Sequence, residues 1–265
     1  MNTKGLQQTV SIQPRADFNK EDYTTLIEQK GRQVLFEKAL LCPCKSKSTN
    51  QQSGCKNCGG TGWVYVNPKK TRMVISAIKV VTEYRSWSQE TRGMANCSAL
   101  DCDELSDMDK LTILDGISYF KEVCFFRQDP DNLGTWFTFT NYPIKAMRYC
   151  GRYVDNNTKF TELVEGTDFT ISGKTITLLT NLPTSDDQVS ITIRYVYSPA
   201  FVVIDIGRET MQSFEYSNGT EKLISLPISA IIRRTHVEFP ELNKAGNNIL
   251  DNNFIEAPLI INTCM

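Results

Sequence analysis

The sequence predicts a mainly β protein with an N-terminal helix and a zinc knuckle, in which a small β-barrel is followed by a β-sandwich-like unit. Three observations support this fold class. Short runs rich in β-branched and aromatic residues recur from residue 73 onward, with Gly, Pro and Asn between them. Residues 189–197 are apolar or aromatic at every odd position, which is the period of a half-buried strand. Four cysteines lie within the seventeen residues 42–58.

The composition limits what kind of protein this is. The chain has 265 residues, which is room for one or two domains, and 40% apolar with 22% charged residues is typical of globular proteins. Its net charge of -1 gives no overall attraction to nucleic acid or to an anionic membrane. The N-terminal stretch lacks the apolar core of a signal peptide, and no apolar run is long enough to span a membrane. We therefore expect a soluble protein without membrane contact.

The helix is expected over residues 19–40. Asn19 can cap its start, and two acidic residues in the first turn complement the helix dipole. Gly31 weakens the middle of this helix by about 1 kcal/mol relative to alanine.

The rest of the chain is divided by pattern and composition. We expect an arm over 1–18, the helix plus the zinc knuckle over 19–66, a small β-barrel over 67–142, a β-sandwich-like domain over 143–220 and an extended segment over 221–265.

The strongest motif is the cysteine segment. Cys42-Pro43-Cys44 is followed after ten residues by Cys55-x-x-Cys58 and then by a glycine-rich stretch. A C-x-x-C turn points two thiolates at one ion, and glycines after it let backbone N–H groups approach the sulfurs. Four thiolates make a closed tetrahedral zinc site with no position open for water, so the site is predicted to be structural. The alternative is four cysteines without metal, free or oxidised.

The remaining chemistry does not favour an enzyme. The nine cysteines are an odd number, and without a signal peptide they favour reduced thiols over a disulfide framework. His236 is the only histidine, which excludes zinc sites that need two or three histidines. A Ser-His-Asp triad would have to use His236, and its surroundings (IIRRTHVEF) favour a strand residue over a general base. We expect no catalytic residues.

Charge is distributed unevenly around the cysteine segment. Residues 28–85 hold eleven basic and three acidic residues, whereas residues 99–116 hold six acidic residues and one basic residue. The candidate contacts to a partner or to DNA in a channel are Lys45, Lys47, Lys56, Lys69, Lys70 and Arg72. The candidate acidic contacts between subunits are Asp101, Asp103, Glu104, Asp107 and Asp109. The alternatives are DNA passing the basic segment, a charged face that meets a protein partner, or two solvated loops.

The motifs resemble those of phage virion proteins of the head-tail connection. The resemblance is carried by the segment that ends in Cys42-Pro43-Cys44, by Cys55-x-x-Cys58-x-Gly-Thr-Gly-Trp63-x-Tyr65, and by residues 108–116 with their Asp-Lys-Leu strand and turn. Residues 165–178 and 189–199 are similar to a β-unit of phage neck and tail proteins. The chain is most similar to neck ring proteins of crAss-like phages, over about residues 20–210.

This resemblance implies a virion structural protein rather than an enzyme. Such a protein is made in the cytoplasm of the bacterial host and assembles as a homo-oligomeric ring, a dodecamer, between the portal protein and other neck or tail proteins. The ring extends the channel through which DNA passes, and zinc holds a loop that docks on a neighbour. Two other functions remain open at this point: a zinc-containing nucleic-acid-binding module, and another tail or baseplate component.

Overall fold

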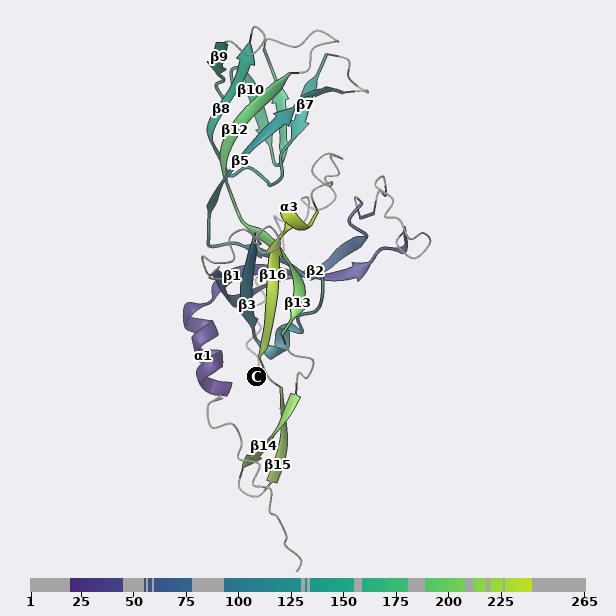
Figure 1. Ribbon diagram of the computed structural model, residues 1–265, viewed down its shortest axis with the longest axis vertical. Helices are drawn as coiled ribbons and strands as arrows, with labels where there is room; N and C mark the ends of the chain where they lie inside the picture. Colours follow the sequence, from purple (N-terminus) through teal and green to yellow (C-terminus); the bar gives the residue numbers. More distant parts are fainter. Residues whose placement is uncertain are drawn as a thin grey trace, which may run out of the picture.

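The protein is mainly β, with an N-terminal helix and a cysteine cluster. The computed structural model describes residues 20–44, 55, 57–58, 60–77, 93–129, 132, 134–154, 159–180, 189–207, 212–217, 220–225 and 227–239. Along the long axis lie a β-sandwich, a six-stranded barrel and a separate two-stranded hairpin (Figure 1). The distal ends of two barrel strands project sideways as an arm that leads to the cysteines (Figure 1).

Helix α1 (Lys20–Lys30) ends much earlier than the sequence pattern predicts. The Gly31 N–H donates to the Ile27 carbonyl (2.8 Å), and the chain then becomes strand β1 (Arg32–Leu41). The prediction of a helix through residue 40 is wrong. Residues 34–37 are all buried, with alternate side chains on opposite faces, which suits a strand covered on both sides better than a one-sided helix.

The barrel closes through six antiparallel pairings in the order β1-β2-β3-β16-β13-β4. Besides β1, its strands are β2 (Trp63–Ala77), β3 (Met94–Ala99), β4 (Lys110–Ile113), β13 (Ala200–Ile206) and β16 (Ile228–Arg234). Phe36 on β1 pairs with Leu111 on β4 and completes the closure. Both side chains are fully buried with Met73 and Ile232 in the barrel core, so the barrel has a single continuous apolar interior.

The sandwich consists of two four-stranded sheets, β10-β11-β7-β6 and β5-β12-β8-β9. Its strands are β5 (Ser118–Phe125), β6 (Arg127–Gln128), β7 (Trp136–Phe139), β8 (Ala146–Val154), β9 (Lys159–Glu162), β10 (Phe169–Ser172), β11 (Thr175–Leu178) and β12 (Ser190–Tyr197). The alternation predicted for β12 is confirmed: Ile191, Ile193 and Tyr195 are buried, facing Phe169 and Ile176 of the opposite sheet within one core.

The sandwich is inserted into the barrel, which corrects the predicted domain boundaries. Strands β5 to β7 lie within the range 67–142 expected for the barrel, yet they belong to the sandwich. Barrel strands lie both before and after the insertion, and Thr112 on β4 pairs with Ala200 on β13, so the two ends of the insertion are adjacent. The alternation of apolar and polar residues identifies each strand but does not reveal which sheet the strand joins. The predicted division into consecutive domains was wrong for this reason.

The C-terminal part is also more ordered than an extended segment. Strands β14 (Gln212–Ser217) and β15 (Thr220–Ser225) form the separate hairpin, β16 enters the barrel, and helix α3 (Thr235–Glu238) follows. The predicted arm over 1–18 and the residues after 239 lie outside the described part of the chain.

The junction between sandwich and barrel is aromatic. His236 lies on α3 rather than on a strand; its Nδ1 is hydrogen-bonded to the Tyr142 hydroxyl, and its ring lies 4.8 Å, edge to face, from the ring of Phe120. Arg234 donates to the Tyr197 hydroxyl at 3.2 Å. These contacts join β5 and β12 of the sandwich to the end of β16, so the single histidine has a structural position between the two units.

A partly buried carboxyl inside the sandwich gives a prediction for how stability depends on pH. Glu122 accepts hydrogen bonds from the Tyr195 hydroxyl (2.7 Å) and the Asn141 N–H (3.0 Å), and burial raises its pKa above the ordinary 4.5. When folding raises the pKa of a group, that group contributes fully to the free energy of unfolding below its unfolded-state pKa. The contribution is lost as pH rises through its folded-state pKa. Glu122→Gln cannot ionise, so the free energy of unfolding of wild type minus that of E122Q should fall as pH rises above 4.5.

Urea unfolding of both proteins across that pH range measures this difference. E165Q, which makes the same substitution at an exposed acid of the same domain, is the control and is measured under the same conditions. A wild-type minus E122Q difference that stays constant with pH would contradict the raised pKa.

Candidate metal centre

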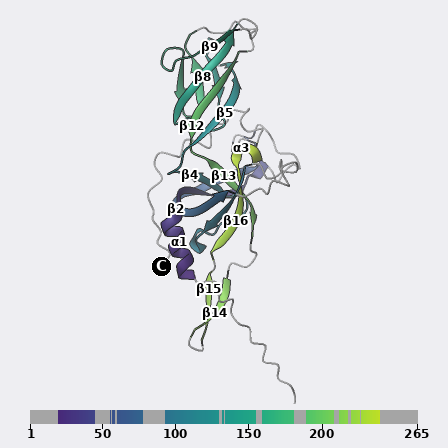
Figure 2. The ribbon, with the colours of Figure 1, turned by 60° about the vertical axis from the view of Figure 1, so that its left-hand side comes forward.

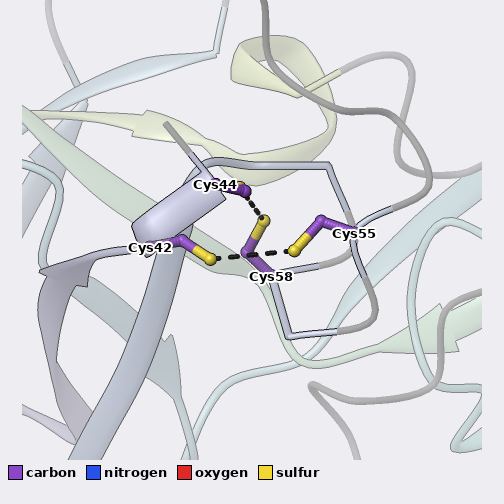
Figure 3. A group of neighbouring side chains, drawn as sticks. All are labelled: Cys42, Cys44, Cys55 and Cys58. Carbon is purple, nitrogen blue, oxygen red and sulfur yellow. Dashed lines mark hydrogen bonds between the residues drawn. The ribbon is translucent and has the colours of Figure 1, made fainter. Parts of the chain in front are cut away.

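The four predicted cysteines meet at the tip of the β1–β2 arm. Leu41, the last residue of β1, pairs with Trp63, the first residue of β2, so both cysteine pairs emerge from one end of a paired hairpin. All four sulfurs lie within 4.8 Å of one another and point toward a common centre (Figure 3). The Cys42 and Cys55 sulfurs are 3.7 Å apart, and those of Cys44 and Cys58 are 3.5 Å apart.

These distances fit a tetrahedral metal ion. Four sulfurs bound to zinc at about 2.3 Å are about 3.8 Å from one another. A disulfide would bring two of them to about 2.05 Å, and all four are free thiols. The cluster can therefore bind a metal ion, and four thiolates leave it no open coordination position.

The turn after Cys58 is built to hold its sulfur and backbone. Gly62, at φ 77°, donates its N–H to the Cys58 sulfur (3.3 Å), and its carbonyl accepts from the Cys42 N–H (2.9 Å). A side chain at this φ would be strained, so glycine suits the position. The buried Thr61 hydroxyl donates to the Cys58 carbonyl (2.8 Å) and accepts from the Trp63 N–H (3.0 Å). The predicted approach of a glycine N–H to a sulfur is confirmed, and Thr61 is a supporting residue that the cysteine spacing did not reveal.

The thiols differ in acidity. Hydrogen bonds from the backbone N–H groups of Cys58 and Asn57 lower the pKa of Cys55 to about 6. The hydrogen bond with Cys42, followed by burial, raises the pKa of Cys44. Four neighbouring thiols cannot all lose their protons unless a cation offsets the charge, which is the role a bound metal ion would have.

One cysteine departs from the expectation of reduced thiols. Cys97, Cys124 and Cys150 are free and buried, but Cys102 is disulfide-bonded. Among the described residues, one group of His, Cys, Asp or Glu side chains is close enough together to hold a metal ion. It consists of the four cysteines of the arm.

The basic residues predicted to contact a partner or DNA have different surroundings. Lys45, Lys47 and Lys56 lie outside the described residues. Lys69 is only 20% exposed at its side chain, because its Nζ lies 2.8 Å from the Asp103 carboxylate and also donates to the Cys102 carbonyl. Arg72 donates to the Glu28 carbonyl, and Lys70 is partly exposed. Lys69 is therefore an internal partner rather than a surface contact, and Lys70 stays a prediction.

Most of the acidic residues are also paired inside the chain. Asp103 is 1% exposed and accepts from Thr71 as well as facing Lys69. Asp109 is fully buried and accepts from the N–H groups of Ala39 (2.7 Å) and Ser106 (2.8 Å). The prediction that Asp103 and Asp109 contact another subunit is wrong, since neither carboxylate reaches the surface.

The other acidic candidates are closer to the surface. Asp101 pairs with Lys20 on α1 (3.0 Å), and Glu104 pairs with Lys38 on β1 (2.6 Å). Asp107 is exposed and remains a candidate contact. The oppositely charged segments thus meet each other within one chain, where the loop before β4 packs against α1, β1 and β2.

No protein-family model and no curated protein sequence matches this chain. Among the helices that the structure describes, none combines the length and apolar composition needed to cross a membrane.

Proposed function

We propose that the protein is a virion structural component that forms a ring in a phage neck, between portal and tail, and extends the DNA channel. The observation that carries this proposal is the position of the cysteine cluster. A four-thiolate zinc site at the tip of a projecting arm can fix the shape of the arm, but it has no coordination position for a substrate. Its role is architectural, as expected of an assembly component.

The arm carries apolar side chains that its own chain leaves uncovered. Leu40 is 55% exposed and Leu41 is 63% exposed, directly before Cys42. Neighbouring residues in a strand point to opposite faces, so each face of the arm presents one leucine. A two-stranded hairpin is marginally stable in water without further support. A metal ion at its tip would hold it in shape for docking on a neighbouring subunit or another neck protein.

The assignment to a phage neck comes from the resemblance of the motifs, and the structure is compatible with it. The resembling segments include the arm with its four cysteines and residues 108–116, which contain strand β4 of the barrel. An elongated chain of sandwich, barrel and hairpin (Figures 1 and 2) offers several separate contact surfaces, as a ring component between two partners requires.

A zinc-containing nucleic-acid-binding module is less well supported. That function needs exposed basic side chains around the arm. Among the candidates that the structure describes, Lys69 is ion-paired with the buried Asp103, the exposed Arg72 donates to the backbone of α1, and Lys70 is only partly exposed.

Native mass spectrometry of the purified full chain tests the proposed function, because it reports metal content and copy number together. We expect one zinc ion per chain and either a ring of about twelve copies or a monomer that forms this ring when purified portal is added. The proposal would be contradicted by a chain without zinc. It would also be contradicted by a zinc-loaded monomer that does not bind the portal and copurifies with nucleic acid.

A further inference from the structure

Strand β4 is the shortest strand of the barrel, and it closes the barrel against β1. The two strands pair over four residues, from Val34 with Ile113 to Glu37 with Lys110. Strand β1 continues beyond Glu37 to Leu41, where the arm reaches the cysteines. The pair Glu37–Lys110 is therefore the last backbone pair of the closing seam, at the base of the arm.

The side chains of this pair are in contact and almost fully buried. The Lys110 Nζ atom lies 2.9 Å from the Glu37 Oε2 atom, and the Lys110 and Glu37 side chains are 7% and 10% exposed. The ring of Tyr65 lies on another side of the ammonium, with its centroid 5.3 Å from Nζ. Bulk water therefore has little access to the amine or to the carboxyl group.

The pair lacks hydrogen bonds that usually stabilise a buried ion pair. Within the described part of the chain, the Glu37 Oε2 atom forms no hydrogen bond of ordinary geometry, even with the nearby ammonium. The Tyr65 hydroxyl is also buried without a hydrogen-bond partner among the described residues. Burial, followed by the charge of Glu37, raises the pKa of Tyr65. Buried charges destabilise a fold when hydrogen bonds do not satisfy them, so a reaction that removes both charges is favoured here.

The other lysine ion pairs that the structure describes differ from this one. Lys69 faces the buried Asp103, but that carboxylate also accepts a hydrogen bond from Thr71. Lys20 and Lys38 form pairs nearer the surface, and each of these lysine side chains is 37% exposed. A buried amine, a buried carboxylate and an unsatisfied carboxylate oxygen thus occur together at one lysine pair of the described residues.

We propose that Lys110 and Glu37 join in an intramolecular isopeptide bond, an amide between the Lys110 Nζ and the Glu37 Cδ atoms. A proton first moves from the ammonium to the carboxylate that it contacts, which leaves a neutral amine and a neutral acid. The Nζ lone pair attacks Cδ and a C–N bond forms, while the C–O bond to the protonated oxygen breaks. The leaving hydroxyl takes a second proton from the nitrogen and departs as water. The reaction consumes no oxidant, reductant or co-reactant.

Proximity in the folded chain makes this condensation favourable. A free amine and a free carboxylic acid do not condense readily in water, but groups held in the right geometry reach effective molarities of about 10⁵ M or more. The 2.9 Å contact holds the Lys110 amine beside the Glu37 carboxyl group throughout the life of the folded barrel. The same burial keeps water away from the product and slows its hydrolysis.

The bond connects β1 to β4 covalently where the projecting arm leaves the barrel. It keeps the closing seam together when the hydrogen bonds of the four-residue strand β4 open. Force that a neighbouring molecule applies to the arm enters the barrel at this point. The isopeptide bond therefore gives the barrel a mechanical strength that its short seam lacks, and it forms within one chain whether or not the proposed ring assembles.

Mass spectrometry of the full chain tests this bond. Wild type, purified folded and then denatured, should have a mass one water molecule below the mass calculated from its sequence. Lys110→Arg keeps the positive charge, but its guanidinium stays protonated and does not form the amide, so K110R should have its full sequence mass. Trypsin should release from wild type a branched peptide in which residues 33–38 are joined to residues 93–121, because it does not cleave after an amide-linked Lys110.

Lys69→Arg is the matched control, because Lys69 also faces a buried carboxylate. K69R should remain one water molecule below its own sequence mass and yield the same branched peptide. Wild type at its full sequence mass, or a link that joins other residues, would overturn the proposal. The branched peptide is read from wild type alone, so the result stands even where K110R does not fold.

Discussion

Cys58→Ser is expected to abolish metal binding and to release the end of the arm from its folded shape. Serine is a poor ligand for zinc, and its oxygen cannot replace the thiolate that completes the tetrahedron. It also removes the sulfur that accepts from the Gly62 N–H. Apparent binding free energies of structural zinc are about 10–16 kcal/mol in zinc-finger peptides, and in small sites most of this energy is folding energy. The change should therefore affect the arm more than any other single substitution in it.

The barrel and sandwich should remain folded in this variant. The cluster lies outside both hydrophobic cores, whose buried residues come from the barrel strands and from the sandwich sheets. We expect loss of metal in elemental analysis, faster amide exchange at residues 60–66, and unchanged exchange in β12 and β16. Assembly should also weaken if the arm docks on a neighbour.

Cys124→Ala is the matched control for this result. Cys124 is a free, buried thiol of the sandwich core and lies far along the chain from the cluster. This variant should lose some sandwich stability and keep full metal content. If C58S retained metal at the wild-type level and normal exchange in the arm, the four-cysteine site would be wrong.

The cysteine site could be predicted from sequence because all its determinants are local. Two short cysteine pairs and the glycines after them specify the turn, and strand pairing adds only the register of Leu41 with Trp63. The support from Thr61 was missed because a threonine in a turn carries no distinctive spacing.

The charge pattern shows where local reasoning fails. The opposed charges of the two segments were visible, but their sequence does not say whether they meet within one chain or between chains. Lys38 and Glu104 are 66 residues apart and pair directly. Only the closure of the barrel brings β1 beside the loop before β4, so the intramolecular pairing follows from topology that no local pattern contains.

The same limit explains the domain boundaries. Each strand of the sandwich was recognisable from alternation or β-branched residues, but an insertion is defined by pairing between β4 and β13 across about ninety residues. A sequence read from one end to the other assigns neighbouring strands to one unit. The barrel breaks that rule, because its first and last strands flank the whole sandwich.

Gly31→Ala is expected to destabilise the barrel and displace α1, with an effect of about 3 kcal/mol. A Cβ at this position would lie 2.2 Å from the Ile27 carbonyl oxygen and 3.2 Å from the Met73 backbone nitrogen. The first contact is with backbone rather than with the end of a flexible side chain, so the chain itself must move. Helix propensity alone would give the opposite sign, because alanine stabilises a helix relative to glycine by about 1 kcal/mol.

This difference in sign makes the substitution decisive for the N-terminal region. If the helix continued through residue 40, G31A would raise the free energy of unfolding. If the helix ends at Lys30 and the chain continues as β1, G31A should lower the free energy of unfolding. Denaturant unfolding of G31A and wild type measures which change occurs. Gly116→Ala is the control, because its added Cβ would meet only the Ile113 Cγ2 atom, which belongs to a side chain and not to the backbone. G116A should therefore lower the free energy of unfolding much less than G31A. The loss in G31A comes from the close approach of the backbone at residue 31, and replacing a glycine does not by itself produce it.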